Sequence, residues 1–177
     1  MPEEMATTAT LRAVPGLQAA VEELLFVEAL YLDRKEWAAW VEMYEPHAEY
    51  WAPSWLGEDE VGSDPNSQVS FIYHTSRAQL QERIARIQSR KSITALPLPR
   101  TLHMISNVMV SEGDGRTLNV RSCWTAHVYD PRTYKQHLHF GTYEHRLAKV
   151  DGNFRIARKK IVIMNDRIPA VLDFYSI

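Results

Sequence analysis

Hydrophobic residues recur at helical spacing in the first part of the chain and at strand spacing in the last part. Over residues 17–33 the apolar positions fall on one face of a helix; they are Leu17, Ala20, Val21, Leu24, Leu25, Tyr31 and Leu32. From Trp37 to Tyr44 an aromatic-rich stripe repeats at i, i+3, i+4 and i+7, which predicts a short second helix over about residues 35–44. Pro46 cannot continue that helix, so we expect it to end there.

The spacing then changes to that of a strand. Residues 47–52 predict a first strand that stops at Pro53. Residues 56–70 are polar and contain glycine and proline, which predicts a long surface loop. The short apolar run at 71–74 predicts either a brief strand or the lip of a pocket.

A third helix is expected over residues 77–90, with Ser76 as its N-cap. Its apolar positions are Leu80, Ile84 and Ile87. Arg83, Arg86 and Arg90 occupy another face of this helix. That face is either a solvated charged surface or a docking surface for an acidic partner; nucleic acid is disfavoured by the overall acidity of the chain.

The remainder of the chain predicts strands at 102–110, 118–128, 136–150 and 154–164. The strict alternation from Leu118 to Val128 is typical of a half-buried antiparallel strand. Helices that precede a run of strands indicate an α+β fold. We therefore expect a strongly curved antiparallel sheet in which the N-terminal helices pack, forming a cone with a potential pocket.

Composition narrows the possible functions. The chain has 177 residues and a formal net charge of −2. That length predicts one domain over residues 17–177 after a flexible arm at 1–16, with roughly 70% of the unfolded surface buried on folding. The near-neutral charge and the sequence pI of about 6.4 argue against nucleic acid or an anionic membrane as partner. No apolar run is long enough to span a membrane and the N-terminus has no signal-peptide pattern, so we expect a cytoplasmic protein.

Cysteine usage limits the chemistry further. Cys123 is the single cysteine, which excludes an internal disulfide framework and a cysteine-rich structural zinc site. A Rieske cluster needs two cysteines, so this chain cannot hold one. The sequence also lacks a Gly-rich phosphate loop, a GxGxxG motif and a GxSxG elbow. We expect no cofactor in this chain.

Three segments and the C-terminus carry a family resemblance. EWAAWVEMYEPHAEYWAPSW (36–55), RTLHMISNVMV (100–110) and DGNFRIARKKIVIMND (151–166) resemble the small (β) subunit of aromatic-ring-hydroxylating dioxygenases. The ending IMNDRIPAVLDFYSI (163–177) is similar to that of the benzoate, anthranilate and halobenzoate group. The resemblance extends over nearly the whole chain, from about residue 17 to residue 177.

The resemblance implies a cystatin-like cone of the nuclear-transport-factor type. It also implies a mainly structural, non-catalytic subunit in a hexamer of three α and three β chains that oxidises an aromatic carboxylate. In that assembly the α subunit carries the Rieske 2Fe–2S cluster and a mononuclear Fe(II), and electrons come from NADH through a reductase. The lone cysteine agrees with this division of labour, because a chain that cannot hold the cluster must depend on one that does.

An alternative from another class is a self-sufficient cone-fold hydratase or isomerase. Asp33, Tyr31, Tyr50, His74 and His103 could converge in the mouth of the cone as an acid–base pocket. Likeness to cone-fold enzymes is a fold-level argument only. The simpler interpretation of all five is core or interface side chains with satisfied hydrogen bonds.

His137 and His139 have the sharpest metal-like spacing, because residues two apart on a strand point to the same side. With Glu144 they could form a two-histidine, one-carboxylate site. Glu144 has the opposite strand parity, however, so we favour exposed or interface histidines that are hydrogen-bonded to neighbours.

Subunit contacts are the remaining expectation. We expect the α-subunit contact to include Arg83, Arg86, Arg100, Arg158 and Lys160. Most of the tryptophans should be core residues, but Trp51 and Trp55 border the Pro53 break, where aromatic rings often anchor interfaces. The apolar tail from residue 168 onward, with Phe174 and Tyr175, should pack against the sheet or a neighbouring β subunit.

Overall fold

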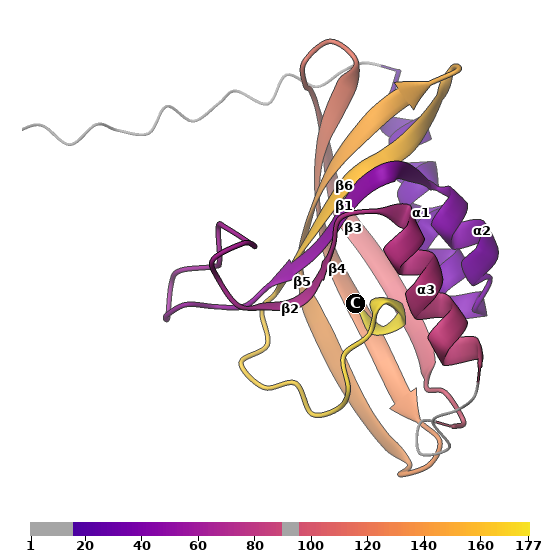
Figure 1. Cartoon of the computed structure of the whole chain (residues 1–177), viewed down its shortest axis with the longest axis vertical. Coiled ribbons are helices and arrows are strands. Elements are labelled where there is room, and N and C mark those ends of the chain that lie inside the picture. The colour runs from indigo at the N-terminus through magenta and orange to yellow at the C-terminus, as the bar shows by residue number, and fades with distance from the viewer. Residues whose placement is uncertain (1–15, 90–95) are drawn as a thin grey trace, which may run out of the picture.

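The computed structural model describes residues 16–89 and 96–177 (Figure 1). Its elements, in chain order, are α1 (Gln18–Arg34), α2 (Trp37–Glu42), β1 (Tyr44–Pro53), β2 (Ser70–His74), α3 (Arg77–Gln88), β3 (Arg100–Glu112), β4 (Thr117–Asp130), β5 (Lys135–Val150), β6 (Asn153–Ile163) and the 3-10 turn η2 (Phe174–Ser176). The predicted arm at 1–16 lies outside the described residues except for Gly16, and so does Arg90 at the predicted end of the third helix.

Six strands form one sheet in the order β2-β1-β6-β5-β4-β3. All neighbouring pairs are antiparallel except β1 and β6, which are parallel. The expectation of a wholly antiparallel sheet is therefore wrong for this one pair. Parallel neighbours need a long crossover, and here β2, α3 and the β3–β5 strands all lie between β1 and β6 in the chain.

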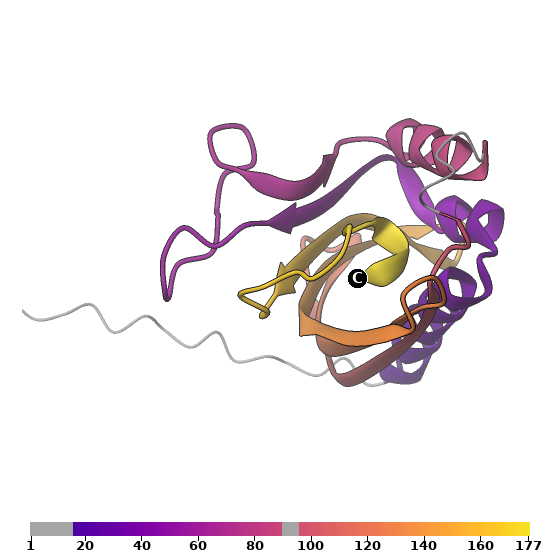
Figure 2. The same cartoon turned by 90° about the horizontal axis from the view of Figure 1, so that it is seen from below.

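The sheet is strongly curved, so that it has a concave face and a convex face. Figure 2 shows the strands wrapping around the C-terminal segment, with the helices gathered along one side of the sheet. The concave face carries the core; its largest buried side chains include Trp40, Trp124, Tyr44, Tyr50, Tyr143, Leu25, Leu32, Leu80, Leu147 and Phe174. This is the predicted α+β cone. The convex face presents the alternate residues of each strand.

Burial follows the predicted periodicity. Along β4 the even-numbered positions from Leu118 to Val128 are buried while the odd-numbered ones are exposed or half-buried. In α3 the buried positions are Leu80 and Ile84, and the Ser76 side chain accepts a hydrogen bond from the backbone N–H of Gln79 as an N-cap should. Periodicity thus placed these elements correctly.

The junction between α2 and β1 differs from the prediction. Tyr44 begins β1 instead of ending the helix, because the backbone N–H of Ile156 in β6 donates to the carbonyl of Met43 at 2.8 Å. Pro46 lies inside β1, within the stretch from Tyr44 to Glu49 where the register against β6 shifts. Proline cannot donate a hydrogen bond to the ladder, which explains why the regular pairing with β6 is interrupted there.

The C-terminal tail packs against the sheet of its own chain, which is one of the two predicted alternatives. Asp173 accepts from the backbone N–H of Phe174 and forms a capping box with Ser176 around η2. Phe174 stacks on Trp40 at 4.8 Å between ring centroids, and Tyr175 stacks on Trp37 at 5.9 Å. The tail therefore fills the concave side of the sheet with aromatic rings.

Candidate functional site

A charged cluster lies in the interior of the cone. The Nζ of Lys159 on β6 donates to Oε1 of Glu28 on α1 at 2.8 Å, and both side chains are almost fully buried. Tyr44 and Trp40 donate to the same carboxylate, with 3.3 Å between Trp40 Nε1 and Oε1. His145 Nε2 lies 3.6 Å from Glu28 Oε2. One carboxylate thus joins the first helix to the last two strands and the aromatic core.

These contacts and the burial of the cluster shift the pKa values of its members. Burial alone would raise the pKa of Glu28, but the charge of Lys159 and the nearby His145 ring outweigh it and hold that pKa far below its usual range. Burial lowers the pKa of both Lys159 and His145, and Glu28 partly opposes the change. Burial and the charge of Glu28 raise the pKa of Tyr44. At neutral pH Glu28 is therefore ionised and Tyr44 keeps its proton.

Sequence reasoning missed this cluster, although each member carried a signal. Glu28 falls on the apolar stripe of the first helix beside Leu25 and Leu32, where a charge needs a partner. Lys159 shares a face of β6 with Ile161 and Ile163. That face meets one buried carboxylate, and the Lys159 ammonium lies 4.1 Å from the ring centroid of Tyr143.

The alternative catalytic residues converge only in part. Asp33 binds His103 twice, through Nδ1 at 2.6 Å and through the backbone N–H at 2.9 Å. Burial raises the pKa of Asp33, but the hydrogen bond and charge of His103 lower it overall. Tyr31, Tyr50 and His74 make no hydrogen bond to this pair within the described parts of the chain. His74 lies instead beside a separate hollow of about 290 Å³ next to β2, as the pocket-lip alternative for residues 71–74 anticipated.

The two-histidine arrangement does not form a metal site. Among residues 16–89 and 96–177, no three His, Cys, Asp or Glu side chains are grouped so that they could hold a metal ion. The ring of His139 is buried, and its Nδ1 lies 2.9 Å from the carbonyl oxygen of Ser176, so the expectation of exposed or interface histidines is wrong for His139. The C-terminal turn covers it. Glu144 points to the other face of β5, as parity predicted.

The convex face of the sheet carries a cluster of apolar side chains in contact with solvent. In the register of β3, β4 and β5, Leu102 aligns with Leu138 across His127, and Met104 aligns with Phe140 across Thr125. We call the following set the outer apolar cluster: Leu102, Met104, Leu138, Phe140 and Met164, which are 57%, 58%, 41%, 43% and 40% exposed. Exposed Leu, Met and Phe side chains concentrated on one face are typical of interaction surfaces.

Charged residues flank the outer apolar cluster on the same face. The register aligns Arg121, Glu144 and Lys160 in one row across β4, β5 and β6. Lys160 lies 5.0 Å from the ring centroid of Trp51, and Arg158 pairs with Glu49 at 2.6 Å. Arg100 extends over Tyr129 at the other end of the face.

The structure therefore divides the predicted interface residues into two groups. Arg100, Arg158, Lys160 and Trp51 lie on the convex face. Trp55 is half-buried at the end of β6, where its Nε1 donates to the carbonyl of Ile163 at 2.6 Å. The second group lies away from this face: Arg83 and Arg86 are on α3, and Phe174 and Tyr175 are on η2. Trp51 and Phe174 are each 1% exposed and offer almost no surface to a partner in this chain.

Known proteins resemble this chain in sequence and in architecture. The model of the family described as ring hydroxylating beta subunit matches residues 27–170. The β subunit of toluate 1,2-dioxygenase from Pseudomonas putida is 37% identical over 158 residues, covering 89% of this chain and 96% of that one. The chain belongs to the ring-hydroxylating dioxygenase β-subunit family.

Other members agree with this assignment. The small subunit of anthranilate 1,2-dioxygenase from Acinetobacter baylyi is 34% identical, covering 91% of this chain and 98% of the relative. The crystal structure of the benzoate 1,2-dioxygenase β subunit from Burkholderia mallei matches with a TM-score of 0.73 at 30% identity, covering 90% of this chain and 96% of that one. The predicted resemblance to the benzoate and anthranilate group is confirmed.

The cone fold itself is wider than the β-subunit family. A candidate scytalone dehydratase from Novosphingobium aromaticivorans matches with a TM-score of 0.65 at 18% identity over 86% of this chain and 89% of that one, which shows a shared fold alone. The alternative of a self-sufficient hydratase or isomerase is not favoured, since the more similar relatives are dioxygenase subunits. No helix in the part of the chain that the structure describes is long and apolar enough to cross a membrane.

Proposed function

We propose that this β subunit stabilises the oxygenase component of an aromatic-carboxylate dioxygenase, by binding an α subunit that carries the Rieske cluster and a mononuclear iron. The names of its relatives point to benzoate, toluate or anthranilate as the class of substrate. We further propose a cytoplasmic assembly of three α and three β subunits, which receives electrons from NADH through a reductase.

The outer apolar cluster carries this proposal. Its five side chains are 40–58% exposed in the isolated chain, and removing them from water would supply the hydrophobic part of a subunit contact. Arg100 and Lys160 at its margins would meet acidic groups of the α subunit. We assign the predicted α contact to these convex-face residues and to Arg158. Arg83 and Arg86 lie apart from them on α3.

Co-expression with a cognate α subunit tests the apolar part. Replacing Leu138 and Phe140 by Asp should abolish co-elution of the two chains in size-exclusion chromatography, because each Asp would have to be desolvated in the contact. Tyr134→Asp is the matched control, since Tyr134 is 80% exposed and lies in the β4–β5 turn outside the cluster. Normal assembly of the double variant, with the Rieske absorption intact, would show that this face is not the α-subunit contact.

The charged part has its own test. Replacing Arg100 and Lys160 by Glu should weaken co-purification most at low salt, because exposed charges are screened as the ionic strength rises. An equal yield of complex at low and high salt, matching that of the unmodified chain, would remove these residues from the contact.

A further inference from the structure

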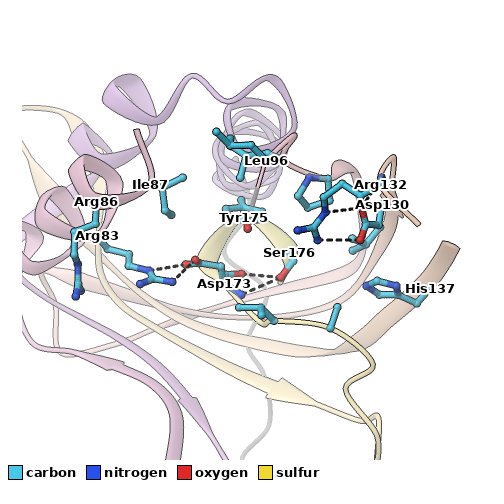
Figure 3. A pocket seen from close by; sticks show the side chains of 15 residues that line it. Arg83, Arg86, Ile87, Leu96, Asp130, Arg132, His137, Asp173, Tyr175 and Ser176 are labelled. Carbon is cyan, nitrogen blue, oxygen red and sulfur yellow. Dashed lines mark hydrogen bonds and ion pairs between the residues drawn. The ribbon is translucent and has the colours of Figure 1, made fainter. Parts of the chain in front are cut away.

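The two end strands of the sheet differ in length and in what lies beside them. β2 has only 5 residues, and α3 and the C-terminal tail lie along its outer side, where Arg83 pairs with Asp173 (Figure 3). β3 has 13 residues and is the end strand on the other side. In the described parts of the chain no strand pairs with its outer edge. A long end strand presents unpaired backbone N–H and C=O groups, to which a strand of another chain can add.

The composition of β3 favours such pairing. Leu102 and Met104 are each more than half exposed, and only His103 and Val110 of this strand are buried. Exposed apolar side chains on an unprotected end strand promote association with other copies. Identical chains carry the same edge, so the partner that fits the β3 edge is β3 of a second copy.

α1 covers this edge along its length. Gln18, at the start of the helix, donates through Nε2 to the carbonyl oxygen of Val108 at 2.8 Å. Asp33, near the end of the helix, accepts from the backbone N–H of His103 at 2.9 Å and from the hydroxyl of Thr101 at 2.9 Å. Gln18 and Asp33 are about 22 Å apart along the helix axis, and the stretch from Thr101 to Val108 is about 24 Å long. The helix and the edge therefore match in length, and we call Gln18 and Asp33 the edge caps.

Further contacts hold both edge caps in place. The Nε2 of Gln18 also donates to Oε1 of Glu22 at 2.7 Å. Oδ1 of Asp33 lies 2.6 Å from Nδ1 of His103. Burial raises the pKa of Asp33, but the hydrogen bond and charge of His103 lower it overall, so the carboxylate is ionised at neutral pH. An ionised carboxylate only accepts hydrogen bonds, so it occupies the edge N–H and offers no donor to an incoming strand.

We propose that the edge caps Asp33 and Gln18 close the β3 edge against β3 of a second copy. Alternate residues of a strand direct their backbone groups to the same side, so Thr101 and Ile105 share the outward direction of His103. Without the Asp33 cap these three residues would form the ladder of an antiparallel pair between two copies. The closure is selective, because it covers the backbone and leaves the outer apolar cluster exposed on the convex face.

Light scattering coupled to size-exclusion chromatography tests the proposal on the full chain alone. Asp33→Ala should raise the mass average about 1.5-fold over that of the unmodified chain when the chain concentration equals the Kd of the new pair. Thr101→Val is the matched control, because it removes one hydrogen bond to Asp33 and leaves the carboxylate over the N–H of His103. Asp33→Asn should also behave like the unmodified chain, since its amide oxygen can still accept from that N–H. Equal masses for Asp33→Ala and Thr101→Val over the whole concentration range would overturn the proposal.

A second variant keeps the test decisive if Asp33→Ala does not fold. Gln18→Ala opens the other end of the edge without touching the contact between Asp33 and His103, and it should raise the mass average in the same direction. A Gln18→Ala chain that matches the unmodified chain in mass would then count against the proposal.

Amide hydrogen exchange shows whether the new contact is the β3 edge. In dilute Asp33→Ala the amide of His103 should exchange faster than in the unmodified chain, because its acceptor is gone. As the concentration rises, the amides of His103 and Ile105 should become protected by pairing with the second copy. A rise in mass without this protection would place the association elsewhere and overturn the proposal. The assay uses no α subunit, so its outcome is independent of the proposed α contact.

Discussion

The buried Glu28–Lys159 pair gives the sharpest prediction about stability. Replacing Lys159 by Met keeps an unbranched chain of similar volume and leaves Glu28 without its cation at the centre of the core. Removing one partner of a buried ion pair costs about 3–5 kcal/mol. In a chain of this length that corresponds to a fall in Tm of about 6–20 °C.

The pH dependence gives the same prediction a second, sign-specific test. In the unmodified chain the pKa of Glu28 is lowered, so its contribution to stability is lost as the pH falls below the ordinary glutamate range. Without Lys159, burial dominates and raises the pKa of Glu28 above its unfolded value. The folded variant then binds more protons than the unfolded chain, so its stability should increase as the pH is lowered from 8 towards 5, while that of the unmodified chain should not.

Urea unfolding across this pH range measures both effects. Glu28→Gln combined with Lys159→Met is the control, because it removes both charges and keeps a hydrogen-bonding group beside Tyr44 and Trp40. The double variant should recover most of the lost free energy, since a neutral pair leaves no uncompensated buried charge. A Lys159→Met variant within about 1 kcal/mol of the unmodified chain, with an unchanged pH profile, would refute the reasoning.

Three other expectations concern the fold. Burial lowers the pKa of His145, so below about pH 6.5 the unfolded chain takes up a proton that the folded chain does not. His145→Gln should therefore reduce the dependence of the unfolding free energy on pH by up to about 1.4 kcal/mol per pH unit between pH 6.5 and 5. An unchanged pH dependence in urea unfolding would contradict this. Gly141→Ala should prevent normal folding, because the added Cβ would lie 1.9 Å from the carbonyl oxygen of Val162. Gly57→Ala is the control, because a Cβ at Gly57 would have no atom within 4 Å. Equal Tm values for the two variants would show that β5 and β6 can move apart at this point. Truncation after Asn165 should give insoluble or unassembled chain, because Phe174 and Ile177 belong to the core; a soluble, assembled truncation measured by size-exclusion chromatography would reject that role for the tail.

Local pattern predicted the elements well and their long-range partners poorly. The strands from β3 to β6 followed from alternation and turn residues that act over a few positions. The parallel pairing of β1 with β6 could not be predicted in this way, because Glu49 and Arg158 are 109 residues apart and no short-range signal selects that neighbour. The Glu28–Lys159 contact spans 131 residues and was missed for the same reason.

The proposed contact surface shows a related difficulty. Leu102, Met104, Leu138 and Phe140 were assigned correctly to strands. Both strands also carry residues on their inner faces, such as His103 and His139, that are polar yet buried. When a buried face contains histidine and an exposed face contains leucine, composition points to the wrong side. Only the register against β4 and the packing of α1 and the tail decide which face meets solvent.

The position of β6 between β1 and β5 also has a consequence for biosynthesis. During translation β1 emerges early, but the strand that pairs with it along one edge is the last one made. Contacts between such distant segments form slowly, since the loop that joins them must close first. The nascent chain therefore carries an unmatched strand edge and an unpaired Glu28 until translation is nearly complete, a period in which chaperones or a neighbouring subunit can act on it.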